Sequence, residues 1–225
     1  MLSIITVTWN SYDWLDLLLE SLERFTSCKY NIIVVDNSVD PIKLDNVHQI
    51  INNENIGHGA GLNLGVTHVE NEFTMFLDVD CHVLCYGWEQ HFLNLMNEFD
   101  VVGGKGVPQK PIRPACMFMK TEIAKKYDWQ ATPGYKGVRG CVPGTDVAIG
   151  AFHQMIADNV PIKLLEPNKS HYESLNGEEF WIDEKPLIFH SWHGSHLAER
   201  QVDFPNDDLI QDKKRLFSQI PWRIL

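Results

Sequence analysis

Long apolar runs, basic residues near the start and paired cysteines are all scarce in this 225-residue sequence. No apolar run approaches the roughly 18 residues that a membrane-spanning helix requires, so we expect no transmembrane segment. No basic leader precedes the first apolar run, so we expect no cleaved signal peptide. The net charge of −11 argues against a general binder of nucleic acid or anionic membranes.

The five cysteines are odd in number and widely scattered, which is typical of reduced thiols in a cytoplasmic protein and not of a disulfide framework. Cys81 and Cys85 flank His82, but no second ligand pair follows at the spacing of a structural zinc site. With 44% hydrophobic and 22% charged residues, the composition is that of an ordinary globular protein. The length predicts a single domain over residues 1–225.

Short apolar runs alternate with helical periodicity in the first hundred residues. Strands are predicted at Ile4–Val7, Ile32–Val35 and Phe73–Leu77, and helices at Leu15–Phe25 and Trp88–Phe99. This alternation predicts an α/β fold with a mostly parallel central sheet and helices on both faces. Ligands bind beyond the carboxyl ends of the strands in such sheets. Three of those ends carry polar residues, which would share one crevice: Asn10, Asp36, Asp78 and Asp80.

The second half of the chain is less regular. Residues 129–144 hold four glycines and two prolines, which predicts an irregular loop. Thr145 then caps a predicted helix that has Asp146 in its first turn. The other predicted elements are strands at Ala115–Met119, Pro161–Leu165 and Leu187–Phe189, and a short helix at Thr121–Asp128.

Asp78-Val79-Asp80 follows the third strand. Two carboxylates at this spacing can approach one divalent cation together, and a hard cation such as Mg²⁺ or Mn²⁺ bridges to a diphosphate. The alternative interpretation is that aspartates end strands because they favour turns.

A glycine-rich segment, Asn55–Gly65, precedes this motif. Its glycines would let the backbone approach a nucleotide or phosphate, and Asn63 could hold a ring or a hydroxyl. The spacing differs from the dinucleotide-binding fingerprint. A plain glycine-rich loop that leads into a helix is the alternative interpretation.

Two later positions carry candidate chemistry. His190 directly follows an apolar strand and His193 comes three residues later, and a histidine at a strand end can complete a carboxylate metal site. With His196 they form three histidines at three-residue spacing, for which a zinc hydrolase site is a lower-ranked alternative because no H-E-x-x-H helix or clear general-base glutamate accompanies them. Asp146 is favoured by the helix dipole and suits a general base. The alternatives are an ordinary hydrogen-bonded histidine and a helix-capping acid.

Together these motifs resemble the family 2 glycosyltransferases of the GT-A fold, and the rhamnosyltransferase branch most of all. The resemblance covers about residues 3–196. The motifs that carry it are Val7-Thr8-Trp9-Asn10, Val34-Val35-Asp36-Asn37-Ser38, the Asn55–Gly65 segment, Phe76-Leu77-Asp78-Val79-Asp80, Gly144-Thr145-Asp146 and Phe189-His190-Ser191-Trp192-His193-Gly194.

The resemblance implies an inverting, metal-dependent transfer of a sugar from a nucleotide-diphosphate donor to an acceptor hydroxyl. Residues 1–100 would form the half that binds the nucleotide-sugar, and residues 101–225 the acceptor and catalytic-base half. Thr8, Trp9, Asn10 and Asp36 would contact the nucleotide, Asn63 would help to close the pocket, and Asp78 would touch ribose or sugar. Asp80 with His190 or His193 would hold Mn²⁺ or Mg²⁺ against the diphosphate, and Asp146 would be the base.

The acceptor implied by the resemblance is a glycan, a lipid-linked glycan or another hydroxyl compound, for a cytoplasmic enzyme that can be peripheral to a membrane. Residues 105–139 carry 8 basic and 2 acidic groups, net +6. We hypothesise that this stretch meets an anionic partner, nucleic acid included, through Lys105, Lys110, Arg113, Lys136 or Arg139. A solvated surface is the alternative.

Two other functions fit parts of the pattern. A nucleotidyltransferase that makes sugar nucleotides also uses a nucleotide-binding α/β sheet, but it usually has a Gly-rich, Arg-containing loop where this chain has Trp9–Asp13. A non-catalytic subunit that binds sugar nucleotides is favoured only by Thr145, which stands where the family usually has a glutamate.

Overall fold

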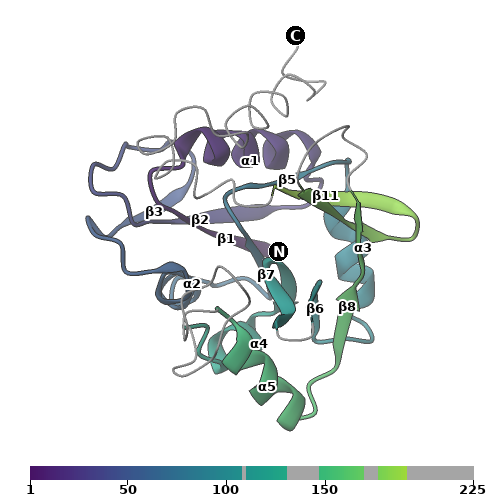
Figure 1. The fold of residues 1–225 in the computed structure, drawn as a ribbon. Helices are drawn as coiled ribbons and strands as arrows, with labels where there is room; N and C mark the ends of the chain where they lie inside the picture. Colours follow the sequence, from purple (N-terminus) through teal and green to yellow (C-terminus); the bar gives the residue numbers. More distant parts are fainter. Residues whose placement is uncertain (108–109, 131–146, 170–176, 192–225) are drawn as a thin grey trace.

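The computed structural model describes residues 1–107, 110–130, 147–169 and 177–191. Figure 1 shows the arrangement of the elements. The strands are β1 Leu2–Thr8, β2 Tyr30–Asp36, β3 His48–Ile51, β4 Phe73–Leu77, β5 Cys81–Val83, β6 Val101–Val107, β7 Lys110–Lys120, β8 Ile162–Leu165, β9 Pro167–Lys169, β10 Gly177–Ile182 and β11 Lys185–Ser191. The helices are α1 Tyr12–Phe25, α2 His58–Val66, α3 Trp88–Leu95, α4 Thr121–Lys126 and α5 Ile149–Ala157.

Seven strands form the central sheet in the order β3-β2-β1-β4-β7-β6-β8. Only β7 runs against its neighbours, β4 and β6, while the other pairings in this sheet are parallel. The predicted α/β fold with a mostly parallel sheet and helices on both faces is therefore confirmed. Apolar runs predict such strands well because a strand that is covered on both faces has no polar side.

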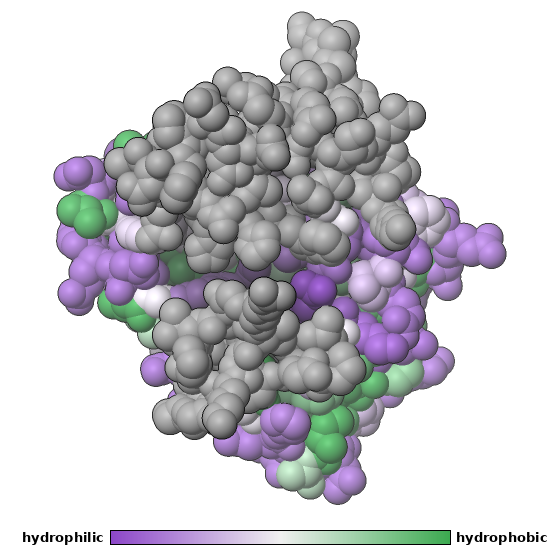
Figure 2. All heavy atoms as spheres, in the orientation of Figure 1, coloured by the Kyte–Doolittle hydropathy of each residue, from purple (hydrophilic) through white to green (hydrophobic). Residues whose placement is uncertain are grey.

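Helices and a second sheet cover the two faces of the central sheet (Figure 1). On one face, α1 and α3 pack with the second sheet around buried side chains such as Trp14, Trp88 and Phe118. On the other face, α2, α4 and α5 enclose a separate cluster that includes Phe76 and Trp129. The coloured surface in Figure 2 is mainly hydrophilic, with apolar side chains gathered at its lower edge.

The second sheet is antiparallel, with the order β5-β11-β10-β9, and the sequence patterns did not predict it. β5 begins directly after Asp80 and pairs with β11 so that Cys81 lies opposite His190. Ser191 donates its backbone N–H to the Asp80 carbonyl at 3.0 Å, which ties the end of β11 to the turn after β4. The second sheet thus places His190, from late in the chain, next to Asp78 and Asp80 in the turn after β4.

The helix predicted to follow Thr145 begins later than expected, at Ile149. Ala148 has φ +66°, a left-handed conformation that a helix cannot include, so the helix starts at the next residue. Thr145 and Asp146 lie outside the described residues. No helix in the described ranges is long and apolar enough to cross a membrane.

Candidate functional site

The carboxyl ends of β1, β2 and β4 meet at one edge of the central sheet and build the candidate site. Thr8 at the end of β1 lies opposite Asp36 at the end of β2. Asn37 donates its backbone N–H to the Thr8 carbonyl at 2.9 Å, and Asn10 donates its N–H to Ser38 Oγ at 2.8 Å. These contacts join the two segments that the sequence placed beside a nucleotide.

A pocket of about 360 Å³ opens at this edge. Its lining residues are Val7, Thr8, Trp9, Ser11, Asn37, Asn55, Gly57, His58, Asp78 and Val79. Two buried polar atoms, Thr8 Oγ1 and Trp9 Nε1, have no hydrogen-bond partner among the described residues. Because unpaired buried polar groups cost free energy, both residues favour a polar ligand that supplies the missing contacts.

Thr8, Trp9 and Asn37 form the pocket wall at the ends of β1 and β2. Asp36 is fully buried behind this pocket wall, and both of its carboxylate oxygens accept hydrogen bonds from the protein. Oδ2 accepts from the Tyr12 hydroxyl and from Gln49 Nε2, each at 2.9 Å, and Oδ1 accepts from the Ser38 N–H at 3.0 Å. In this arrangement Asp36 orders the Asn37–Ser38 segment that faces the pocket.

Glycines in the Asn55–Gly65 segment let α2 approach its neighbours closely. A Cβ on Gly59 would lie 2.6 Å from the Trp129 carbonyl oxygen, and one on Gly65 would lie 2.6 Å from the Ile5 side chain. Gly57 has φ +89° and leads the chain from the pocket into the helix. The structure therefore supports a packing role for Gly59 and Gly65 and a turn role for Gly57.

Asn63 lies on α2 but is not among the residues that line the pocket. Its Nδ2 donates to Asp128 Oδ1 at 2.6 Å, and its Oδ1 accepts from the Trp129 N–H at 2.9 Å. Asn63 thus fastens the segment after α4 to the helix that starts at the pocket.

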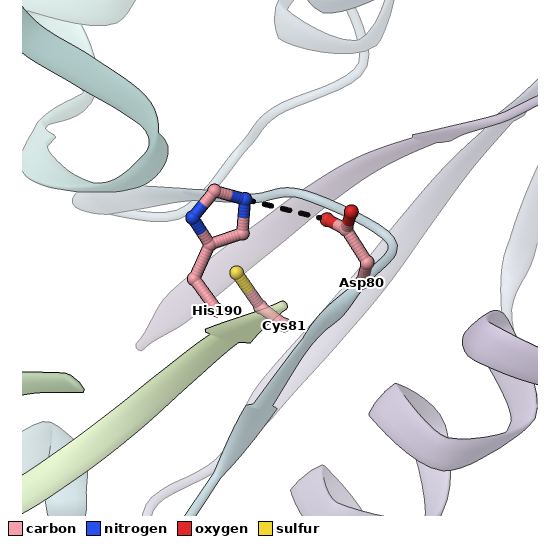
Figure 3. Close-up of side chains that lie close together, drawn as sticks. All are labelled: Asp80, Cys81 and His190. Carbon is pink, nitrogen blue, oxygen red and sulfur yellow. Dashed lines mark ion pairs between the residues drawn. The ribbon is translucent and has the colours of Figure 1, made fainter. Parts of the chain in front are cut away.

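Asp78, Asp80 and His190 converge beside the pocket, and Figure 3 shows His190 and Asp80 facing each other. His190 Nε2 lies 3.6 Å from Asp80 Oδ1 and 3.9 Å from Asp78 Oδ2. His58, at the start of α2, places its Nε2 3.3 Å from Asp78 Oδ1. Two carboxylates from the turn after β4 and histidines from β11 and α2 therefore lie close together.

This arrangement fits a divalent cation. Asp78 Oδ2 and Asp80 Oδ1 offer lone pairs, and so does Nε2 of a neutral His190 ring that carries its proton on Nδ1; in that form none of the three atoms can donate to another. A proton on the ring or a cation among the three atoms would offset their repulsion. Burial disfavours the charged form of His190, but its hydrogen bond to Glu178 and the nearby aspartates outweigh burial and raise the pKa of the ring.

Cys81 lies beside Asp80 and His190, and one potential ligand atom from each of the three lies within 4.8 Å of the others (Figure 3). Burial raises the pKa of its thiol well above the usual range, and the charges of Asp78 and Asp80 add to this effect. The thiol donates to the Ala115 carbonyl at 3.2 Å. A neutral thiol is a poor ligand for a hard cation, so Asp80 and His190 are the better candidates.

His58 and Glu178 are site residues to which the sequence reasoning gave no role. Glu178, on β10, contacts His190 Nδ1 at 3.2 Å. His58 lies inside the glycine-rich Asn55–Gly65 segment, and this position was the only feature of the sequence that could have indicated a role in the site. Glu178 belongs to no motif, and only the pairing of β10 with β11 brings it to the site.

Five basic residues of the 105–139 stretch have partners among the described residues, while the side chain of Lys110 is outside the described part of the structure. Their ion pairs are Lys105 with Glu166, Arg113 with Glu178, Lys120 with Asp100 and Lys126 with Asp158, and Lys125 donates to the Val69 carbonyl. Carboxylates from other segments therefore balance four of the eight basic residues of this stretch. Lys136 and Arg139 lie outside the described residues, as do His193 and Asp146.

The chain matches the sequence model of Glycosyl transferase family 2 over residues 3–151. No curated protein sequence matches it. Among solved structures, residues 1–349 of S. aureus TarS align with a TM-score of 0.53 and 17% identity over 97% of this chain and 72% of TarS 1–349. TarS 1–349 in complex with UDP-GlcNAc aligns with a TM-score of 0.50 and 15% identity, over 83% of this chain and 57% of that one.

A second protein has a similar fold, the mannosyltransferase PcManGT from Pyrobaculum calidifontis in complex with GDP-Man and Mn²⁺. It aligns with a TM-score of 0.53 and 12% identity, over 72% of this chain and 54% of that chain. The chain therefore spans just over half of the two ligand-bound structures. At these identities the comparisons establish the GT-A-type fold.

Proposed function

This chain belongs to glycosyl transferase family 2 and is a glycosyltransferase, and we propose that it is a metal-dependent, inverting one. It would move a sugar from a nucleoside-diphosphate donor to an acceptor hydroxyl. The observation that carries the proposal is the convergence of Asp78, Asp80 and His190 beside a pocket with unpaired polar atoms. Because these residues come from both halves of the sequence, residues 1–225 would act as one domain.

Asp80 and His190 would hold Mn²⁺ or Mg²⁺, with His193 as a further candidate ligand. When bound, the cation would stabilise the negative charge that develops on the leaving diphosphate. Asp78 would turn toward the ribose or the sugar, and His58 beside it would limit the positions that its carboxylate takes. The Mn²⁺ and GDP-Man in the PcManGT complex support this choice of cation and donor.

The nucleotide would lie against the ends of β1 and β2. Thr8, Trp9 and Asn10 would contact it directly, and the unpaired Thr8 Oγ1 and Trp9 Nε1 support this placement. Asp36 would act on the base or ribose through the Asn37–Ser38 segment that it orders. Asn63 would help to close the pocket indirectly, because it fastens the Trp129 segment to α2.

Asp146 would be the general base. It would take the proton from the acceptor hydroxyl as that oxygen attacks the anomeric carbon from the face opposite the diphosphate, which inverts the configuration. Ala148, two residues later, donates its N–H to the Trp129 carbonyl at 3.2 Å. This contact lies next to Gly59 near the start of α2 and supports a position for the base close to the pocket.

The donor would be a nucleoside-diphosphate sugar, as in the neighbours that bind UDP-GlcNAc and GDP-Man. The resemblance of the Asn55–Gly65 segment favours a rhamnosyltransferase. The acceptor would be a glycan, a lipid-linked glycan or another hydroxyl compound. Since Lys105, Arg113 and Lys120 are paired, contact with an anionic acceptor would depend on Lys110, Lys136 and Arg139. The four cysteines in the part of the chain that the structure describes are free, which supports a cytoplasmic site of action that could be peripheral to a membrane.

The test is to incubate the protein with a panel of UDP-, GDP- and dTDP-sugars and Mn²⁺. Two quantities are measured for each donor: the release of the nucleoside diphosphate and the melting temperature of the protein. A ligand at about 100 times its Kd adds about 2.7 kcal/mol of stability, which a melting curve resolves. Asp146→Asn should lower turnover by about 10²- to 10⁴-fold while donor binding persists. Asp80→Asn should remove metal-dependent donor binding. If no nucleoside diphosphate raises the melting temperature with metal present, the proposal fails.

A further inference from the structure

Glu178 is a buried carboxylate to which the proposed mechanism gives no role. Only 3% of the residue is exposed, and it lies on β10 directly opposite His190 of β11. Its Oε1 is 3.2 Å from His190 Nδ1 and also 3.2 Å from Arg113 Nε, which reaches it from β7. One carboxylate oxygen thus joins the histidine to an arginine from the central sheet.

The contact with Glu178 decides which nitrogen of His190 carries the proton in the neutral ring. A carboxylate oxygen accepts hydrogen bonds, so Nδ1 must be the donor, and the lone pair of the neutral ring is then on Nε2. Nε2 is the atom that faces Asp80 and Asp78. The opposite tautomer would place a hydrogen on Nε2, where a cation is to bind, and a lone pair on Nδ1 against the carboxylate.

We propose that Glu178, held by Arg113, is a positioning residue that keeps His190 in the Nδ1–H form with Nε2 directed at the cation site. This inference rests on the proposed function, because it assigns His190 as a metal ligand. Arg113 balances the charge of Glu178 from a different strand, through the ion pair between its Nε and Glu178 Oε1. Carboxylates that orient a metal-binding histidine in this way typically change metal affinity about 10- to 100-fold when mutated.

A purely structural role for Glu178 makes a different prediction. Removal of a buried, paired carboxylate would then lower stability without a selective effect on the metal or on the ring. Glu179 offers a matched control, since it is the next residue of β10, is also fully buried and accepts from Trp181 Nε1 at 3.0 Å. It projects from the opposite face of the strand, away from His190.

The experiment uses the full chain as wild type, Glu178→Ala, Glu178→Gln and Glu179→Gln. Nitrogen-15 NMR of the imidazole in EDTA reports the tautomer of His190, and Mn²⁺ titration followed by EPR, without any donor, reports metal affinity. Glu178→Ala should shift the ring toward the Nε2–H form and weaken Mn²⁺ binding about 10- to 100-fold. Glu178→Gln keeps an acceptor oxygen and should retain the Nδ1–H form with a smaller loss, while Glu179→Gln should match wild type in both measurements.

The outcomes separate this inference from the proposed function. An Nε2–H ring in the wild type, or Mn²⁺ affinity that is the same in Glu178→Ala and Glu179→Gln, would overturn the inference and leave the proposed function intact. A wild-type protein that binds no Mn²⁺ would overturn the proposed function and, with it, the role of Glu178 toward the metal. If Glu178→Ala unfolds, Glu178→Gln still tests the inference through its Mn²⁺ affinity, which should be lower than that of Glu179→Gln; equal affinities of these two variants would overturn the inference.

Discussion

Tyr12→Phe removes the hydroxyl that donates a hydrogen bond to Asp36. Its effect shows whether Asp36 mainly orders the pocket wall or mainly contacts the nucleotide. The Tyr12 hydroxyl donates to Asp36 Oδ2 at 2.9 Å and accepts from the Ile42 N–H at 3.2 Å. If Asp36 orders the pocket wall, the loss should appear first as lower stability. If Asp36 instead turns to the nucleotide, its bond to Tyr12 should matter little for folding.

The structure sets the size of the effect. A hydrogen bond to a charged group contributes about 1.5–3 kcal/mol, and without Tyr12 the buried Asp36 Oδ2 would keep Gln49 as its partner among the described residues. The Ile42 N–H is exposed and can turn to water, so its loss adds little. We expect a fall of about 2 kcal/mol in the free energy of unfolding, or roughly 4–8 °C in melting temperature for a chain of this size.

The assay is urea unfolding together with a melting curve, on apo protein and in the presence of Mn²⁺ and the tightest nucleoside diphosphate. Tyr86→Phe is the control, because 73% of Tyr86 is exposed and its change should cost less than about 0.5 kcal/mol. A Tyr12→Phe protein as stable as the control, with nucleotide affinity reduced tenfold or more, would refute the role of Asp36 as an anchor of the wall.

Other changes test the packing, the thiols and the charges. Gly59→Ala should lower the free energy of unfolding by about 1–3 kcal/mol despite the higher helix propensity of alanine, because its Cβ would meet the Trp129 backbone; an unchanged or raised urea midpoint would contradict this contact. Burial raises the pKa of Cys81 and Cys116 well above the usual range, so at pH 8 both thiols should resist a thiol reagent until the protein unfolds. Labelling is mapped by mass spectrometry, and rapid labelling of either cysteine in the native protein would contradict the burial. Lys105→Gln removes an exposed ion pair and should change stability by less than about 1 kcal/mol and leave the salt dependence of donor turnover as it was; a large change in either would revive a binding role for this lysine.

The sequence predicted the central sheet and the edge where the site lies, and the reason is physical. Parallel strands covered on both faces are nearly continuous apolar runs, so Ile4–Val7, Ile32–Val35 and Phe73–Leu77 stand out in a single sequence. The polar residues that end these runs must then meet at the carboxyl edge. Asp78 and Asp80 could be placed there before any coordinates were known.

The second sheet and the contacts behind the site could not be predicted in this way. β5 and β9 are three residues each, too short for a periodic signal, and their pairing partners lie about 10 to 100 residues away. Glu178 therefore carries no functional signal in the sequence, and only the pairing of β10 with β11 brings it next to His190. Gly59 gave a signal that fitted two roles, and only the Trp129 backbone beside it favours packing.

Charge summed along the chain does not by itself distinguish a binding surface from ordinary ion pairs. The basic stretch suggests a binding surface in the sequence, but four of its residues pair with carboxylates from other segments, as Lys105 does with Glu166 and Lys126 with Asp158. Segment charge counts cannot include partners that only the fold supplies. A strong positive segment in an acidic protein is thus compatible with ordinary ion pairs.

Calorimetric titration of UDP and GDP tests the central claim most directly, that a cation held by Asp80 and His190 is needed to bind the donor diphosphate. The titration compares wild type in Mn²⁺, wild type in EDTA and Asp80→Asn in Mn²⁺. We predict that at least one nucleotide binds the wild type in Mn²⁺ and that its affinity falls about tenfold or more in both other samples. Equal affinity in all three samples would contradict the account.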